Sequence, residues 1–195
     1  MHIYTYAYWA ICPYLQSTRK GRETIVNSTG NDKKEQLRIS VRSLVEFILR
    51  NGDIDNRHTM SSESAMQEGG RIHRMIQKRM GAEYQSEVSL KYVHPAEHYD
   101  LIVEGRADGV IDVAGDVTID EIKGTYRELA HMKGPIPVHL AQAKCYAYMY
   151  SRKNEVKQMQ VRMTYCNMDT EEIRHFTEVC EMAELEVWFG KLIAS

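Results

Sequence analysis

The amino-acid sequence predicts an α/β fold in which a mixed β-sheet is flanked by helices, with the elements in the order α-α-β-β-β-α-β-α. Two observations carry this prediction. Apolar residues recur at helical spacing in several segments, and other segments are strand-like runs, one of which alternates strictly between apolar and polar residues. At 195 residues the chain is long enough for one domain with a sizeable core and too short for two, so we expect a single core.

Residues 1–36 are predicted to be an N-terminal extension, and the folded domain is expected over residues 37–195. The extension begins with an aromatic-rich piece and continues as a polar run. After Ser40, a good helix-capping residue, apolar residues recur at helical spacing as far as Leu49, and the pattern stops at Asn51-Gly52. A short amphipathic helix is therefore predicted at the start of the domain.

A second helix is predicted from about Ser62 to Met80, because small and apolar residues form one stripe along it and Gly81 supplies a stop. Three strands should follow, at residues 84–93, 101–113 and 117–123. The last two are separated by Ala114-Gly115-Asp116, a turn signal. These three strands are predicted to form an antiparallel meander.

The C-terminal part is predicted to form a helix, a strand and a helix. The first helix is expected over residues 138–150. Residues 157–165 alternate between apolar and polar side chains, which predicts a strand with one buried face. Asp169-x-x-Glu172 has the pattern of an acidic capping box, so a final helix is predicted from there to about Ile193.

Composition excludes several classes of protein. No stretch approaches the roughly 18 apolar residues of a membrane span, so a membrane protein is not expected. The first residues lack a basic leader ahead of an apolar block, and the expected compartment is the cytoplasm. The net charge of -2 gives no global electrostatic support for nucleic-acid binding, so any grip on phosphate must come from a local basic surface.

Residue types that suit phosphate chemistry stand on two adjacent predicted strands. The first strand carries Asp108, and the second carries Glu121, Ile122 and Lys123. Alternation puts Glu121 and Lys123 on one face, and a tight loop places Asp108 across from residue 121, 122 or 123. Two carboxylates and the carbonyl of Ile122 suit a hard cation such as Mg²⁺. The Lys123 ammonium can hold an attacking water or offset charge in the transition state.

The alternative is that these charged residues form weak surface salt bridges on an amphipathic hairpin. Their combination with two neighbouring features argues against it. His73 lies on the preceding helix after two glycines, which would let that helix approach a sheet closely. Gln142 and Tyr146, on the helix that follows, are four residues apart and so share one helix face.

Taken together, these residues resemble the RecB-like branch of the PD-(D/E)xK nuclease superfamily. Its signature is a G-x-x-x-H helix, a G-x-x-D strand, an E-x-K strand and a Q-x-x-x-Y helix, in that order. Here the four motifs are Gly69 to His73, Gly105 to Asp108, Glu121 to Lys123 and Gln142 to Tyr146. Each motif is loose, but the ordered set is specific. The resemblance covers about residues 60–165 and implies a restriction-endonuclease-like core.

The resemblance also implies a site and an activity. A Mg²⁺ or Mn²⁺ ion would be held by His73, Asp108, Glu121 and the Ile122 carbonyl, with Lys123 catalytic. Gln142 and Tyr146 would lie near the DNA or the lysine. The implied reaction is hydrolysis of phosphodiester bonds in DNA, as an exonuclease on single-stranded ends in repair or recombination. Glu87, on the first strand, is expected to be a solvated strand residue, with a role as an additional carboxylate the alternative.

Some RecB-like nucleases also bind an iron-sulfur cluster through four cysteines. The chain has four, Cys12, Cys145, Cys166 and Cys180, but they lack the required spacing, and Cys145 falls inside the Q-x-x-x-Y motif. No C-x-x-C pair suggests zinc either. We therefore expect free, buried thiols.

Residues 39–56 are similar to the start of nuclease domains that are fused ahead of DinG-type DNA helicases. The sequence contains no ATP-binding G-x-x-x-x-G-K-[ST] motif, so the likeness implies either the nuclease part alone or a freestanding relative, with a helicase domain or subunit as the implied partner. Two functions from different classes remain: an active DNA nuclease, and a non-catalytic nuclease-like module that binds nucleic acid or a partner. The intact E-x-K motif favours the enzyme. A structure-specific or restriction-type endonuclease on the same fold is a third hypothesis.

Overall fold

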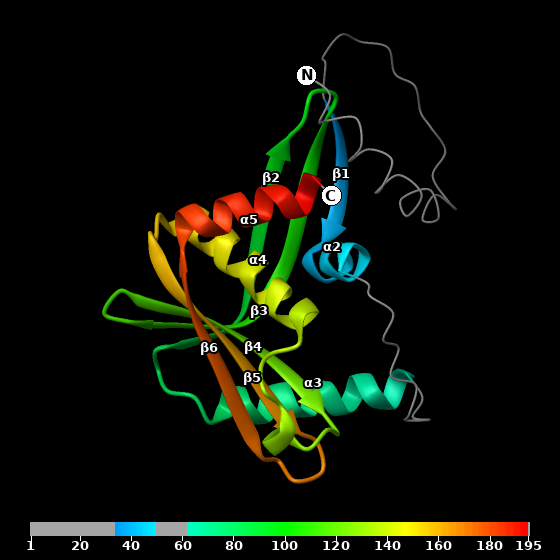
Figure 1. Cartoon of the computed structure of the whole chain (residues 1–195), viewed down its shortest axis with the longest axis vertical. Helices are drawn as coiled ribbons and strands as arrows, with labels where there is room; N and C mark the ends of the chain where they lie inside the picture. The colour runs from blue at the N-terminus through cyan, green and yellow to red at the C-terminus, as the bar shows by residue number, and fades with distance from the viewer. Residues whose placement is uncertain (1–33, 50–61, 195) are drawn as a thin grey trace.

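The computed structural model describes residues 34–49 and 62–194 (Figure 1). The sequence signals beyond them, including the N-terminal tyrosines, Cys12 and the stop at Asn51-Gly52, lie outside the described residues. The elements are β1 (Glu35–Ser40), α2 (Val41–Ile48), α3 (Ser62–Lys78), β2 (Tyr84–Pro95), β3 (Tyr99–Val113), β4 (Asp116–Thr125), the 3₁₀ turn η1 (Leu129–His131), α4 (Pro137–Asn154), β5 (Gln158–Asn167), β6 (Ile173–Glu181) and α5 (Met182–Ala194).

The six strands form one mixed sheet in the order β1-β3-β4-β5-β6, with β2 also paired to β3. Strand β3 is long enough to have different neighbours along its length. β2 runs antiparallel to it over residues 100–111 of β3, so β2 occupies one edge. The other edge is shared: β1 pairs in parallel with residues 99–104, and β4 pairs antiparallel with residues 109–113. A gap between the two partners therefore opens at residues 105–108.

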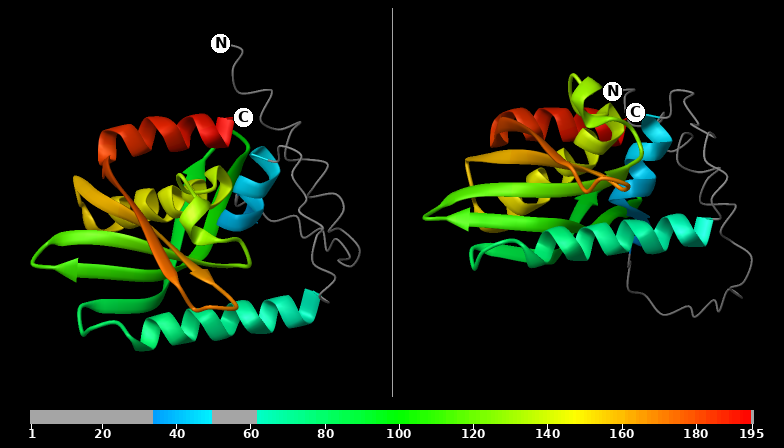
Figure 2. Two further views of the ribbon diagram at one scale, coloured as in Figure 1. Left: turned by 60° about the horizontal axis from the view of Figure 1, so that its bottom comes forward. Right: turned by 90° about the horizontal axis from the view of Figure 1, so that it is seen from below.

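Helices cover both faces of the sheet. Helices α2, α4 and α5 lie on one face and α3 on the other (Figure 2). The main hydrophobic core lies under the first group and contains, among others, Leu44, Ile119, Met149 and Phe189. A smaller cluster lies under α3, where Ile72 and Ile76 pack on Ile122 and Cys166 of β4 and β5. This arrangement confirms the predicted α/β class with a mixed sheet flanked by helices.

Local signals placed several elements correctly. The Ser40 hydroxyl accepts a hydrogen bond from the Ser43 amide at 3.0 Å and so caps α2 as predicted. The meander β2-β3-β4 is antiparallel as predicted. Its second turn has positive φ at both central residues, 55° at Ala114 and 94° at Gly115, which is the pattern of a type I′ hairpin.

The predicted element order is wrong in two places. Strand β1 begins at Glu35. The sequence predicted an extension up to residue 36 and a helix after Ser40, with no strand between them. Only Leu37 and Ile39 alternate with polar residues there, which is too short a pattern to stand out. Its partner is β3, 64 positions further along at Glu35↔Tyr99, so the strand is stabilised by a pairing that local sequence does not reveal.

The second error concerns the final helix, which was expected from Asp169 but begins at Met182. The apparent capping box is a hairpin turn instead: the Asn167 side chain accepts from the amides of Asp169 and Thr170, each at 2.9 Å, and Glu171 has φ 57°. Residues 173–181 then form β6, antiparallel to β5. The apolar residues of this segment also fit a helical spacing, so the sequence pattern was assigned to a helix and not to a strand.

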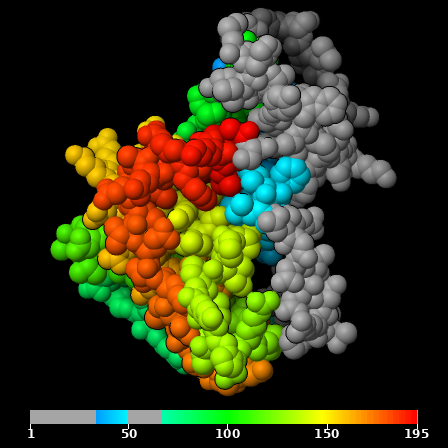
Figure 3. Space-filling view, viewed as in Figure 1, coloured from blue at the N-terminus to red at the C-terminus, as the bar shows by residue number. Residues whose placement is uncertain are grey.

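The segment after β4 is tied to β6. The space-filling view shows it (yellow-green) beside β6 (orange) (Figure 3). The Arg174 guanidinium donates to the carbonyls of Leu129 and Ala130, at 2.6 and 3.1 Å. These contacts fix the path by which the chain leaves β4 and enters α4. In the described part of the chain, none of the helices has both the length and the apolar character needed to cross a bilayer.

Candidate active site

The candidate site lies at the fork where β3 and β4 separate. Their pairing ends at Gly109↔Asp120, after which β4 continues beside β5 alone. The β3 side chains that face the main core are first at odd-numbered positions, Leu101, Val103 and Ala107, and then at an even one, Val110. The alternation along the strand therefore shifts by one residue between 107 and 110. Asp108 lies at this shift. A distorted stretch of strand that lacks a partner on one edge is a typical place for functional side chains.

The Asp108 carboxylate fills the fork. One oxygen, Oδ2, accepts from the backbone amide of Ile122 at 2.8 Å. The other oxygen, Oδ1, lies 3.2 Å from Nδ1 of His73. Because the amide and carbonyl of a strand residue point to the same side, the Ile122 carbonyl faces the fork as well. Asp108, His73 and the Ile122 backbone are therefore brought together at the fork.

Glu121 is the most buried charged group of the site, with a side chain only 2% exposed. Its Oε1 accepts from the Lys123 ammonium at 2.8 Å, and the same ammonium donates to Oε1 of Gln142 at 3.1 Å. Burial raises the pKa of Glu121 to about 7, against the opposing effect of the Lys123 charge. Lys123 is thus aimed by two oxygen atoms, one from its own strand and one from α4.

His73 reaches the site from α3 and is partly buried. Burial lowers the pKa of His73, but the hydrogen bond and the charge of Asp108 outweigh this effect and leave the pKa above its usual value. The charges of Lys123 and Glu121 also act on the ring, which places His73 in the same electrostatic environment as the strand residues. The histidine of α3 and the charged residues of β3 and β4 therefore form one cluster of interacting charges.

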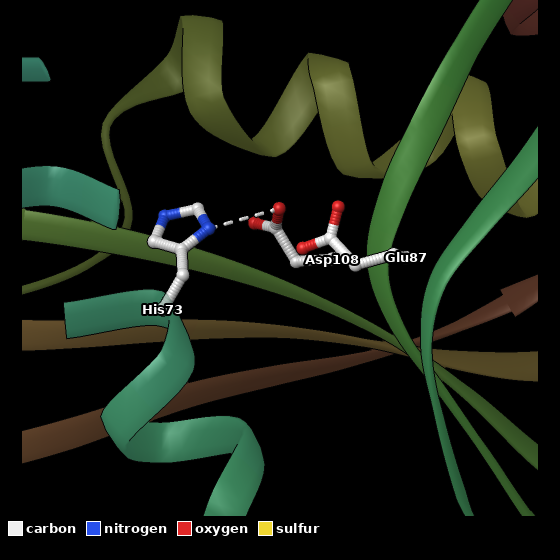
Figure 4. Close-up of side chains that lie close together, drawn as sticks. All are labelled: His73, Glu87 and Asp108. Atoms are coloured by element: carbon white, nitrogen blue, oxygen red, sulfur yellow. Dashed lines mark ion pairs between the residues drawn. The ribbon is translucent and has the colours of Figure 1, made fainter. Parts of the chain in front are cut away.

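Three potential metal ligands form a close group: His73, Glu87 and Asp108 have ligand atoms that all lie within 4.8 Å of one another (Figure 4). Glu87 comes from β2, and its side chain points toward that of Asp108. The expectation of a simply solvated Glu87 is therefore incomplete, because its side chain is 37% exposed but its carboxylate lies at the site. Glu121 is not one of these three.

The residues fit a divalent cation. Oxygen and imidazole ligands with one side open suit the ions used in phosphate chemistry. The Oε2 atom of Glu121 is buried and has no hydrogen-bond partner within the described part of the chain. An unpaired buried carboxylate oxygen costs free energy unless a cation or donor satisfies it. A bound cation would supply that missing partner.

Tyr146 lies in the core, which corrects the DNA-contact half of the expectation that it lies near the DNA or the lysine. Its side chain is only 3% exposed, so it offers no surface to a DNA strand. Its ring packs on β3 at Gly105, where a Cβ would lie 2.8 Å from the tyrosine oxygen, so residue 105 has to be glycine for this contact. Tyr146 therefore packs against β3 on the core side of the fork. Gln142, on the same helix face, contacts Lys123 directly.

Tyr146→Ala should lower the free energy of unfolding by about 3–5 kcal/mol, as expected when a large buried aromatic side chain is truncated. Tyr146→Phe should cost about 1 kcal/mol, because it keeps the ring and loses only the hydroxyl. Urea unfolding followed by circular dichroism measures both values. A Tyr146→Ala protein that is as stable as the wild type but binds single-stranded DNA weakly would restore the direct-contact role.

None of the described cysteines belongs to the group of potential metal ligands. Cys145, Cys166 and Cys180 are free and buried. Cys145 belongs to the main core and Cys166 to the small cluster under α3. Burial raises the pKa of the Cys145 and Cys166 thiols, so both favour the neutral form.

Sequence reasoning missed one residue that connects the site. Gln77 of α3 donates from Nε2 to Oε1 of Glu87 at 2.9 Å and to the Asp108 carbonyl at 3.0 Å. The available signal was its position four residues after His73, which places both on one helix face. Nothing in its residue type distinguished it from a solvated glutamine.

Comparison with known proteins agrees with this geometry. The sequence model of the PD-(D/E)XK nuclease superfamily matches residues 32–194. No curated protein matches the chain. The crystal structure of SSO0001 has a similar fold, with a TM-score of 0.54 and 15% identity over 95% of this chain and 83% of that one.

An alkaline exonuclease (LHK-Exo) from Laribacter hongkongensis shows a weaker likeness, with a TM-score of 0.42 and 13% identity over 80% of this chain and 86% of that one. The family match spans both sides of the fork, from β1 to α5, and includes every residue of the site described above. The chain belongs to the PD-(D/E)XK nuclease superfamily.

Proposed function

We propose that the chain is an active, metal-dependent deoxyribonuclease that hydrolyses phosphodiester bonds and acts as an exonuclease on single-stranded ends. One observation carries the proposal: Glu121 is buried beside Lys123 with one oxygen that has no hydrogen-bond partner among residues 34–49 and 62–194, and the Asp108-His73 pair lies at the same fork. A buried arrangement of this kind is costly to fold and is typical of functional sites. The preference for single-stranded ends comes from the resemblance to RecB-like nucleases.

A Mg²⁺ or Mn²⁺ ion would be held by His73, Asp108, Glu121 and the Ile122 carbonyl. Glu87 offers a further carboxylate. Such an ion supplies Lewis-acid stabilisation of charge on the scissile phosphate. The Glu121 and Gln142 oxygens hold the Lys123 ammonium in place, where it can orient the attacking water or offset charge on the phosphate. In the reaction, a water oxygen bonds to phosphorus as the bond from phosphorus to the leaving sugar oxygen breaks.

The proposal is tested with the full chain and end-labelled DNA, both single-stranded and duplex, in Mg²⁺ and in Mn²⁺. Single-stranded circular DNA is the matched substrate without ends. We expect linear single strands to be degraded and circles to stay intact. Cleavage of circles would make the protein an endonuclease. If no cleavage is seen that substitutions at Asp108 and Lys123 remove, the non-catalytic binding module takes the place of the nuclease.

A further inference from the structure

We propose that Gln77 is a positioning residue that holds Glu87 and Asp108 together, so that Glu87 serves as an additional carboxylate ligand of the cation site. The inference rests on the proposed function, because it assumes that His73 and Asp108 bind a metal ion. It adds a ligand from β2 and a hydrogen-bonding residue from α3 to the site.

The first observation is the backbone at Glu87. The register between β2 and β3 is the same on both sides of Glu87, with Ser86↔Gly109 and Val88↔Ala107, so Glu87 occupies the position opposite Asp108. Yet Glu87 has φ 59°, in the left-handed region that a non-glycine residue rarely adopts within a strand. Such a conformation costs about 1–3 kcal/mol and persists only where surrounding contacts enforce it.

The second observation is the hydrogen bonding of Gln77. Its Nε2 donates to the Glu87 carboxylate at 2.9 Å and to the Asp108 carbonyl at 3.0 Å. Both partners are acceptors, so the amide nitrogen, and not the amide oxygen, has to face them. The two N–H groups of one amide therefore set the spacing between the two carboxylate-bearing strands.

The third observation is that Glu87 is held from two directions. Gln77 bonds Oε1, and the Arg106 guanidinium pairs with Oε2 at 2.5 Å. A side chain that is 37% exposed would otherwise sample several rotamers. Each carboxylate oxygen has two acceptor positions, so these bonds leave lone pairs for a cation. Figure 4 shows the result: Glu87 and His73 flank Asp108 from opposite sides.

Gln77 also connects two parts of the fold. Next to it on α3, His73 contacts Asp108 of β3, while Gln77 reaches both β2 and β3. Arg71 of α3 and Arg79, just after its end, are anchored at a different place, to Glu171 in the β5–β6 turn. The Gln77 contacts therefore set how close the histidine helix stands to the carboxylates.

The test replaces Gln77 by methionine, which has a similar length but no donor. The full chain is titrated with Mn²⁺ alone by calorimetry, and DNA cleavage is measured against Mn²⁺ concentration. We expect the Kd for Mn²⁺ to rise about tenfold or more, the usual effect of removing a group that orients a metal ligand. Saturating Mn²⁺ should restore the cleavage rate to within about threefold, because the catalytic groups remain.

Gln85→Met is the matched control, since Gln85 is an exposed glutamine on β2 two residues before Glu87. It should leave the Kd for Mn²⁺ unchanged. Glu87→Gln should weaken Mn²⁺ binding, and Gln77→Met should cost less in that background than in the wild type, because the two residues act together.

If Gln77→Met lowers the melting temperature but binds Mn²⁺ as tightly as Gln85→Met, Gln77 is merely structural and the proposal is wrong. Equal, additive losses in the two backgrounds would also overturn it. A wild-type protein that binds Mn²⁺ through Asp108 but cleaves no DNA would refute the nuclease function and leave this assignment standing.

Discussion

Lys123→Ala should lower the rate of DNA cleavage by a hundredfold or more, at saturating metal, while DNA binding is kept. The ammonium lies 2.8 Å from Glu121 and 3.1 Å from Gln142, so it is held at the site without being a metal ligand itself. Removing one preorganised electrostatic contact that acts mainly in the transition state costs about 2.7 kcal/mol, which corresponds to that factor. Single-turnover cleavage of labelled single strands measures it.

Lys144→Ala is the matched control. Lys144 and Lys123 have similar exposure, 21% and 22%, and each is paired with a carboxylate, but the partner of Lys144 is Glu178 of β6. A general effect of losing a half-buried ion pair would therefore slow both variants alike. Equal rates for Lys123→Ala and the wild type would remove Lys123 from the catalytic machinery.

Saturating metal is needed in this experiment because Lys123 also partners Glu121. Without the ammonium, both oxygens of a buried carboxylate would lack a donor among the described residues, since Oε2 already has none there. Metal affinity can therefore change together with turnover. Measuring the rate at saturation isolates the transition-state effect from the ground-state one.

The predictable parts of the fold were those with local signals. The hairpin between β3 and β4 follows from the turn signal Ala114-Gly115-Asp116, in which Gly115 has φ 94°, a value that glycine adopts without steric cost. Strands β1 and β6 were missed for different physical reasons. β1 is short and depends on a distant parallel partner, whereas the apolar positions of β6 fit a helix and a strand equally well.

The candidate site was predictable where residue type and order carry the chemistry. Asp108, Glu121 and Lys123 were placed by strand alternation, and the structure brings Asp108 and His73 into contact. Glu87 and Gln77 could not be placed in the same way. Their positions depend on a left-handed backbone in mid-strand and on the distance between a helix and two strands, and neither is encoded in a local pattern.

Tyr146 shows what helical spacing alone cannot predict. Its spacing from Gln142 correctly placed both on one helix face, yet that face is turned partly into the core. Sequence periodicity gives the face but not its neighbours. The decisive neighbour is Gly105, whose missing side chain leaves room for the tyrosine ring.

Asp108→Asn should abolish Mn²⁺ binding and DNA cleavage together, in contrast to Lys123→Ala. Asp108 contacts His73, the Ile122 amide and, through its carbonyl, Gln77. The amide side chain keeps the size of the carboxylate and can still accept from Ile122, so the fold should survive. What it loses is the negative charge that a divalent cation requires.

Asp112→Asn, on the same strand, is the control, because Asp112 is exposed and its carboxylate accepts only a turn amide, that of Gly115 at 3.0 Å, among the hydrogen bonds of the described residues. It should bind Mn²⁺ and cleave DNA as the wild type does. Calorimetry with Mn²⁺ and cleavage assays on the two variants provide the comparison. Retention of tight Mn²⁺ binding by a folded Asp108→Asn protein would mean that the cation is held elsewhere, and the fork between β3 and β4 would then lose its assignment as the metal site.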